Sequence, residues 1–286
     1  MRSRMPDSGT KSNQVLSNYI GLNAAGSAAI PNQSSGIDIF NAATSNVIGD
    51  AGKGNVISGN LAYGISLSVM GTSMNTVKAN LIGLNATATA GIGNAFSGVA
   101  LFNGARSNTI GAPGAGNMIA FNGTAGFYAG VHVFDNTTFG NDFNANSIFS
   151  NSQLGINLEG GSQNGFGVTA NDSGDADNGP NQLQNYPVLT SANSQAVIQG
   201  SLNSVANKAY RIDFYSSPTA DPSGFGEGQT WIGSVNVTTN ASGNATFNQD
   251  FPGSLTPGSV VTATATGTGT NASGTSEFSA AINVVP

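Results

Sequence analysis

Three acidic residues lie close together in a glycine-containing segment of the chain. Asp172, Asp175 and Asp177 fall within six residues, and Asn178 follows them directly. Carboxylate and amide oxygens at such short spacing are the hard ligands that Ca²⁺ prefers. The segment lacks the downstream glutamate of an EF-hand loop. We therefore expect these four residues either to bind calcium and stiffen a domain junction, or to form a solvated acidic linker.

A second candidate group contains the single histidine of the chain. His132, Asp135 and Glu159 could together perform acid–base chemistry. A glycosidase needs two carboxylates about 5.5 Å apart for retention, or about 6.5–9.5 Å apart for inversion. A polysaccharide lyase needs a basic residue instead, and Lys53, Lys78 and Arg106 are scattered through the same region. A lone histidine is also commonly a structural hydrogen-bonding residue, so catalysis is the alternative hypothesis.

An internal repeat decides which of these residues can meet. The segment 98–122 recurs 62 residues earlier, at 36–60. Related short sequence motifs, which we call words, extend over residues 12–160. Self-similarity at a fixed period indicates stacked structural units. The words are short runs with alternating apolar residues, broken by Gly and Asn, which predicts strands rather than helices. One glycine-led word every 25 to 34 residues favours one solenoid coil of three short strands, with asparagines stacked in ladders at the corners.

The words Asn-x-Ile-x-x-Asn and Gly-Ile-x-Leu resemble those of the right-handed parallel β-helix proteins, which have the pectate-lyase-like fold. The resemblance covers residues 12–160. It implies an all-β solenoid. It does not imply one activity, because that fold carries lyases, hydrolases, isomerases, phage tailspikes and inert surface proteins alike.

Alignment of the glycine-led words predicts two outward-facing columns. Adjacent coils lie about 4.8 Å apart, so His132 and Glu159 would be neighbours, with Asp135 just past the strand end. Aromatic rings beside polar groups suit a sugar, which gives the candidate ligand-binding residues Asp38, Phe40, Phe102, Phe134 and Asn157. Alternatively, the Phe rings lie at corners or under the insertions at 24–35 and 86–97. The columns read Asp38, Ser66, Ala100, His132, Asn157 and Phe40, Ser68, Phe102, Phe134, Glu159.

Beyond the repeat the sequence pattern changes twice. Residues 161–186 form an acidic junction, and residues 187–286 contain no Asn-x-Ile words. About seven alternating segments separated by turns in the last hundred residues are typical of an antiparallel β-sandwich of immunoglobulin or fibronectin type. The fold class is therefore all-β, a parallel β-helix followed by a sandwich.

Composition narrows the possible partners. A net charge of −6 with eight scattered basic residues argues against nucleic acid. No apolar run is long enough for a membrane span, and no signal peptide is visible in this chain. The chain has no cysteine, and only 8 % of its residues are charged.

These observations favour an extracellular or cell-surface module with a structural or adhesive role. A polysaccharide or cell-surface glycan is the expected ligand. A carbohydrate-active enzyme, either a polysaccharide lyase or a glycoside hydrolase, is the alternative. Unpaired strand edges at the ends of a β-helix also suggest a homo-oligomer or fibre built through those ends.

Overall fold

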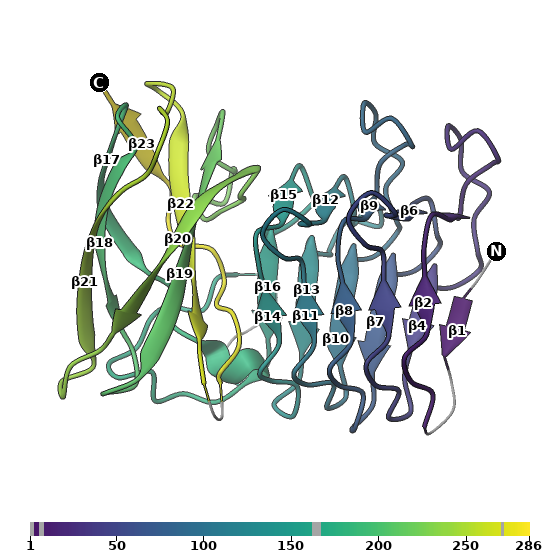
Figure 1. The fold of residues 1–286 in the computed structure, drawn as a ribbon, viewed down its shortest axis with the longest axis horizontal. Helices are drawn as coiled ribbons and strands as arrows, with labels where there is room; N and C mark the ends of the chain where they lie inside the picture. The colour runs from purple at the N-terminus through teal and green to yellow at the C-terminus, as the bar shows by residue number, and fades with distance from the viewer. Residues whose placement is uncertain (1–2, 6–8, 162–166, 270–271) are drawn as a thin grey trace.

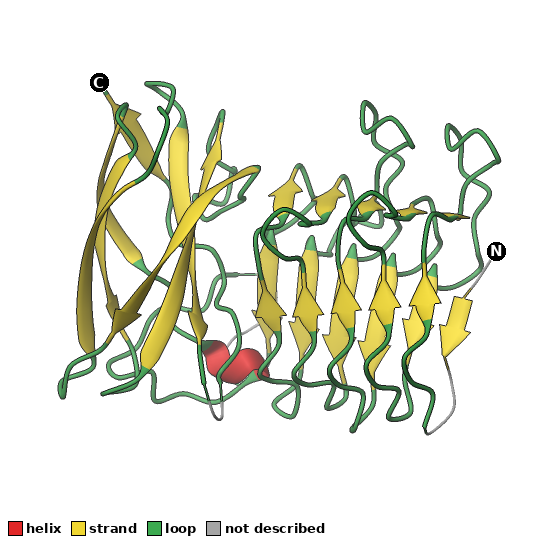
Figure 2. Ribbon diagram, in the orientation of Figure 1, coloured by secondary structure: helices red, strands yellow, loops and turns green. Residues whose placement is uncertain are grey.

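The chain folds into two bodies that lie side by side (Figure 1). The computed structural model describes residues 3–5, 9–161, 167–269 and 272–286. A stack of coils accounts for residues up to 161, and a separate β-sheet body for the C-terminal part (Figure 2). In the described part of the chain the only helix is the short 3-10 segment η1 (Pro180–Leu183). It is too short to cross a membrane, and no described helix is long and apolar enough to do so.

The coil stack is built from three parallel sheets, as predicted for a β-helix. Each complete coil contributes one short strand to each sheet, and every pairing within these sheets is parallel. The first sheet joins β1 (Ser3–Met5), β4 (Ile37–Ile39), β7 (Ile65–Ser68), β10 (Val99–Phe102), β13 (Val131–Phe134) and β16 (Ile156–Glu159).

The other two sheets contain five strands each. The second joins β2 (Gln14–Val15), β5 (Val47–Ile48), β8 (Thr76–Val77), β11 (Thr109–Ile110) and β14 (Asp142–Phe143). The third joins β3 (Tyr19–Ile20), β6 (Val56–Ile57), β9 (Leu81–Ile82), β12 (Met118–Ala120) and β15 (Ser147–Phe149). Strand β1 lies before residue 12 and pairs with β4, so the stack includes residues that precede the sequence repeat.

Stacked aliphatic side chains fill the interior of the coils. Ile65, Val99 and Val131 pair in register along the first sheet and are fully buried. The glycine that opens each word is required by this packing. A Cβ at Gly98 would lie 2.6 Å from the Cγ2 atom of Ile119 and 2.9 Å from the carbonyl oxygen of Gly130.

Three ladders of asparagines, buried except in the first coil, run along the corners of the stack, as the sequence predicted. In each ladder the backbone N–H and the Nδ2 of one asparagine donate to the Oδ1 of the asparagine one coil further on. For Asn75 and Asn108 these distances are 3.1 and 3.0 Å. The ladders contain Asn13, Asn46, Asn75, Asn108, Asn141; Asn18, Asn55, Asn80, Asn117, Asn146; and Asn60, Asn94, Asn122, Asn151.

Residues outside the repeat terminate two of these ladders, which the sequence did not reveal. The N–H of Asn141 donates to Oδ1 of Asn181, in η1, at 3.1 Å. Asn151 donates from its N–H and its Nδ2 to Oε1 of Glu227, at 3.2 and 2.8 Å. These two ladders therefore receive their last acceptor oxygen from the junction and from the C-terminal body, respectively.

The C-terminal body is a separate seven-stranded mixed sheet. All its neighbouring strands are antiparallel except β17 and β23, which are parallel. The sheet curls around one apolar core that includes Ile198, Phe214 and Phe247. Its immunoglobulin or fibronectin type stays a prediction. In spatial order the strands are β20 (Thr230–Thr238), β19 (Ala209–Ser217), β22 (Val260–Gly267), β23 (Ile282–Val285), β17 (Val188–Asn193), β18 (Val197–Asn203) and β21 (Asn244–Asp250).

The C-terminal body covers the last coil of the β-helix. The N–H of Phe143 in β14 donates to Oγ1 of Thr275 at 2.8 Å, and the N–H of Leu158 in β16 donates to Oε1 of Glu277 at 3.0 Å. In β15, Ile148 forms an antiparallel bridge with Gly228. All three sheets therefore meet the second body at this end, and a fibre built through this end would have to displace it.

Removing one rung of a ladder should destabilise the whole stack. Asn108 is fully buried and exchanges hydrogen bonds with the coils on both sides. We expect Asn108→Ala to lower the free energy of unfolding by about 2–4 kcal/mol, because buried donors and acceptors lose their partners. Asn283→Ala, at an exposed position in β23, is the matched control and should change it by less than about 0.5 kcal/mol. Urea denaturation of the three proteins measures this, and equal midpoints would contradict it.

Buried carboxyl groups at the covered end should make stability depend on pH. Burial raises the pKa of Glu277 to about 8, against the hydrogen bonds from Leu158 and Thr169. Because its folded pKa lies above its unfolded value, the stabilisation is complete below pH 4.5 and is lost as the pH rises towards 8. Between pH 6.5 and 9 we expect the free energy of unfolding of the native chain to fall by about 2 kcal/mol more than that of Glu277→Gln. Parallel unfolding curves of the two proteins over this range would contradict the prediction.

Candidate functional site

The two columns expected from the sequence lie in register along the first sheet, but the first column is buried instead of solvent-exposed. Each of its members is at most 8 % exposed, namely Asp38, Ser66, Ala100, His132 and Asn157. Ala100 pairs with Ser66 on one side and with His132 on the other, and His132 pairs with Asn157. Asp38 pairs with Ser66. In the second column Phe102 pairs with Ser68, and Phe134 pairs with Glu159. The repeat therefore predicted the register correctly.

Aromatic rings from successive coils gather on the outer face of the first sheet. The ring of Phe102 lies 6.0 Å from that of Phe134, and the ring of Tyr63 lies 6.0 Å and 6.5 Å from these two. Phe96 stacks on Tyr128 at 4.3 Å, and both contact Tyr63. We call Tyr63, Phe96, Phe102, Tyr128 and Phe134 the aromatic cluster. All five rings are only partly buried, so the cluster retains exposed ring surface.

Sequence reasoning missed three members of the aromatic cluster. Tyr63, Phe96 and Tyr128 are not in the glycine-led words but in the turns that precede them. Each stands one or two residues before the opening glycine of a word, at Gly64, Gly98 and Gly130. That shared position was a detectable signal in the sequence.

A groove opens beside the aromatic cluster. Its volume is about 320 Å³. The Oγ of Ser66 donates to Oδ1 of Asp38 at 2.7 Å, which fixes that carboxylate in the groove floor. The groove is lined by Ser34, Ser35, Asp38, Phe40, Ala62, Tyr63, Ser66, Ser68 and Phe102.

His132 and Glu159 form a hydrogen-bonded pair next to the aromatic cluster. The Nε2 of His132 lies 2.8 Å from Oε2 of Glu159 and 3.2 Å from Nδ2 of Asn157. Burial lowers the pKa of His132 although Glu159 opposes this, and the hydrogen bond from His132 lowers the pKa of Glu159. The pair is therefore a neutral imidazole that donates its Nε2–H to a carboxylate.

The imidazole of His132 supports its neighbours rather than facing solvent. Its side chain is 1 % exposed, against 34 % for Glu159. Its ring lies 3.7 Å from the ring of Phe134. This arrangement orients both Glu159 and Phe134 on the outer face.

The carboxylate of Asp135 is used in the hydrogen bonds of a turn. Its Oδ2 accepts from the N–H of Asn103 at 2.5 Å, and its Oδ1 accepts from the N–H of Thr137 at 2.9 Å. The residue has a φ of 62°, as expected where the chain leaves β13 in a tight turn. Of the three candidate catalytic residues, the structure joins His132 to Glu159, while the Asp135 carboxylate is held by backbone and threonine groups.

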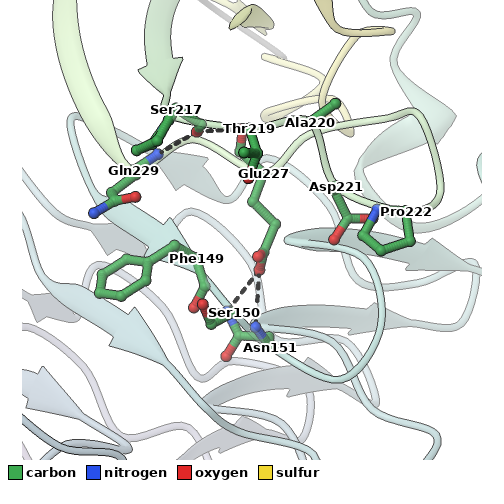
Figure 3. A pocket seen from close by; sticks show the side chains of 11 residues that line it. Phe149, Ser150, Asn151, Ser217, Thr219, Ala220, Asp221, Pro222, Glu227 and Gln229 are labelled. Carbon is green, nitrogen blue, oxygen red and sulfur yellow. Dashed lines mark hydrogen bonds between the residues drawn. The ribbon is translucent and has the colours of Figure 1, made fainter. Parts of the chain in front are cut away.

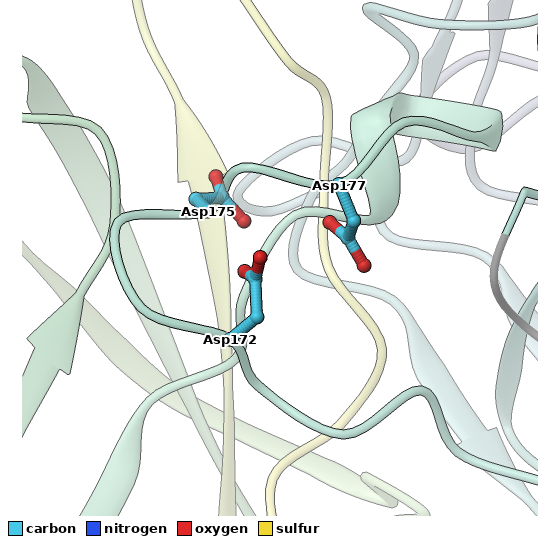
Figure 4. A group of neighbouring side chains, drawn as sticks. All are labelled: Asp172, Asp175 and Asp177. Atoms are coloured by element: carbon cyan, nitrogen blue, oxygen red, sulfur yellow. The ribbon is translucent and has the colours of Figure 1, made fainter.

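The acidic segment of the junction does bring its carboxylates together (Figure 4). Oxygens of Asp172, Asp175 and Asp177 lie within 4.8 Å of one another. Asp175 accepts hydrogen bonds from the N–H of Asn185 at 2.8 Å and from Oγ of Ser204 at 2.7 Å. The donor set consists of hard oxygens and therefore fits Ca²⁺. Asn178, the fourth expected ligand, is exposed.

The electrostatics of this acidic segment favours cation binding. Burial raises the pKa of Asp175 to about 6, and the charges of Asp177 and Asp172 add to the increase. A bound cation would remove that repulsion.

No protein-family model matches this chain, and no curated protein matches it. The function must therefore be argued from the parallel β-helix and from the groups on its outer face.

Proposed function

We propose that this chain is an extracellular surface module whose β-helix binds a neutral glycan along the outer face of the first sheet. The observation that carries the proposal is the aromatic cluster beside the groove that contains Asp38. Flat rings pack against the apolar C–H faces of sugars, and a fixed carboxylate accepts hydrogen bonds from hydroxyl groups.

The charges on this face favour a neutral ligand over an acidic one. Asp38 and Glu159 are the acids of the two columns, and none of the described residues that line the groove is basic. A polyuronate would meet the like charges of these two acids on this face.

The spacing of the coils suits a ligand that runs parallel to the solenoid axis. Phe102 and Phe134 stand on neighbouring strands β10 and β13, and the groove continues to Phe40 beside β4. Neighbouring strands are about 4.8 Å apart, close to the length of one sugar residue in an extended chain. An oligosaccharide would therefore present one sugar for about every coil.

A carbohydrate-active enzyme is the second candidate, because Glu159 is partly exposed and paired with His132. In this alternative Glu159 is the reacting group and His132 positions it. Release of reducing ends from a polysaccharide panel, lost in Glu159→Gln, would support this alternative.

The proposed extracellular location and the proposed self-assembly rest on different observations. The extracellular location rests on the resemblance of the repeat to β-helix surface proteins. Assembly through β-helix ends is proposed only for the edge formed by β1, β2 and β3, since the C-terminal body covers the other end.

Glycan binding is tested by removing one ring of the cluster. We expect Phe102→Ala to weaken binding of a neutral oligosaccharide about tenfold, equivalent to about 1.4 kcal/mol, because one stacking surface is lost. Phe121→Ala is the matched control, since this partly exposed ring contacts Phe149 beside the third sheet. A glycan array followed by titration calorimetry measures this. A silent array, or equal weakening by both substitutions, would count against the proposal.

We further propose that Asp172, Asp175 and Asp177 hold a structural Ca²⁺ at the junction. Added Ca²⁺ should raise the midpoint of thermal unfolding, by about 2–4 °C at ten times its Kd. The increase should be smaller at pH 5 than at pH 7.5, because Asp175, whose pKa is about 6, must lose its proton to bind the ion.

Substitutions separate this site from general salt effects. Asp177→Asn should abolish the calcium-dependent increase, whereas Asp250→Asn, at an exposed position in β21, should retain it. Unchanged melting curves with calcium and with chelator would refute the site.

A further inference from the structure

A polar pocket lies between the last coil of the β-helix and the C-terminal body (Figure 3). Its volume is about 290 Å³. The β-helix contributes Phe149, Ser150 and Asn151, at the end of β15. The C-terminal body contributes Ser217, at the end of β19, and residues of the β19–β20 connection that include Pro218, Asp221, Pro222, Glu227 and Gln229.

Glu227 fills the place of an asparagine in the third ladder. The residue is 6 % exposed, and both hydrogen bonds from Asn151 end on its Oε1. At the end of the first ladder Asn181 provides the same acceptor with a neutral amide. The ladder therefore requires an acceptor oxygen but no negative charge, and Oε2 of Glu227 takes part in neither of the bonds from Asn151.

The charge of Glu227 is unfavourable in the protein alone. Burial raises its pKa to about 7, the hydrogen bonds from Asn151 lower it by less, and Asp221 raises it further. None of the described residues that line the pocket is basic. Two carboxyl groups thus share a pocket that contains no balancing cation.

The rest of the pocket suits an organic group more than a bare metal ion. Calcium takes six to eight oxygen ligands, whereas here one oxygen of Glu227 already serves Asn151 and Oδ1 of Asp221 accepts from the N–H of Ser223 at 2.8 Å. Pro218 and Pro222 add apolar surface to the lining. An ammonium group offers several N–H donors and a charge opposite to that of the two carboxylates.

We propose that this pocket binds an organic primary ammonium group, with Glu227 and Asp221 as its acceptors. Two sources share this chemistry, an amino sugar and a lysine side chain. The site is separate from the glycan-binding face, so either proposal can fail alone.

The test compares two amines with matched neutral and inorganic probes. Glucosamine and Nα-acetyl-lysine amide are titrated into the full chain at constant ionic strength, with N-acetylglucosamine as the neutral control. Ca²⁺ is the inorganic control and is added to Asp177→Asn, which lacks the proposed junction site, where it should give no increase. At ten times its Kd, at least one amine should raise the thermal midpoint by about 2–4 °C. N-acetylglucosamine, which lacks the charge, should give no Glu227-dependent increase.

Variants assign the binding to this pocket. Glu227→Gln keeps the acceptor for Asn151 but removes the charge. This variant should therefore fold, and the amine should no longer raise its thermal midpoint. Asp221→Asn should reduce the affinity, and Phe102→Ala, on the glycan-binding face, should leave it unchanged.

The outcomes are distinct. An increase with glucosamine alone identifies an amino sugar, an increase with the lysine derivative alone identifies a lysine side chain, and both together establish the shared ammonium group. No increase with either amine, or equal increases in native chain, Glu227→Gln and Asp221→Asn, would overturn the proposal.

Discussion

The hydrogen bond from one asparagine to the asparagine of the next coil is the interaction on which this structure depends. Each rung satisfies a backbone N–H and a side-chain amide at a corner where the chain turns and no strand partner is present. Buried polar groups without partners would cost the stack more than its short strands could compensate. The ladders therefore hold strands of only two to four residues in a regular stack.

The same interaction explains why the second body lies where it does. A ladder has a direction, because each asparagine donates towards the C-terminal end and accepts from the N-terminal side. The last coil thus needs acceptors, and Asn181 and Glu227 provide them. Phe278 and Tyr215 extend the apolar core of the solenoid into the C-terminal body. The junction, the ladder ends and this shared apolar core together form one continuous cap over the last coil of the β-helix.

The corners and the interior are committed to the fold, and the outer face of the first sheet is where we propose that a glycan binds. Its columns repeat at each coil, so a groove with Asp38 and a cluster with Phe102 and Phe134 follow one direction. His132 contributes from beneath by orienting Glu159 and Phe134. The face is suited to hold an extended ligand, and its few charges are mostly used within the fold.

The sequence by itself determined the coils, the ladders and the register of the outward columns, because a repeat of fixed length places equivalent residues one coil apart. It also predicted that His132 would meet Glu159 and that Asp172, Asp175 and Asp177 would gather. Only the tertiary structure decided the rest. The turn that binds Asp135, the rings of Tyr63 and Tyr128 and the role of Glu227 all arise from contacts between segments with no common period. Periodicity reports on residues that repeat, whereas caps and pockets are formed where the repeat ends.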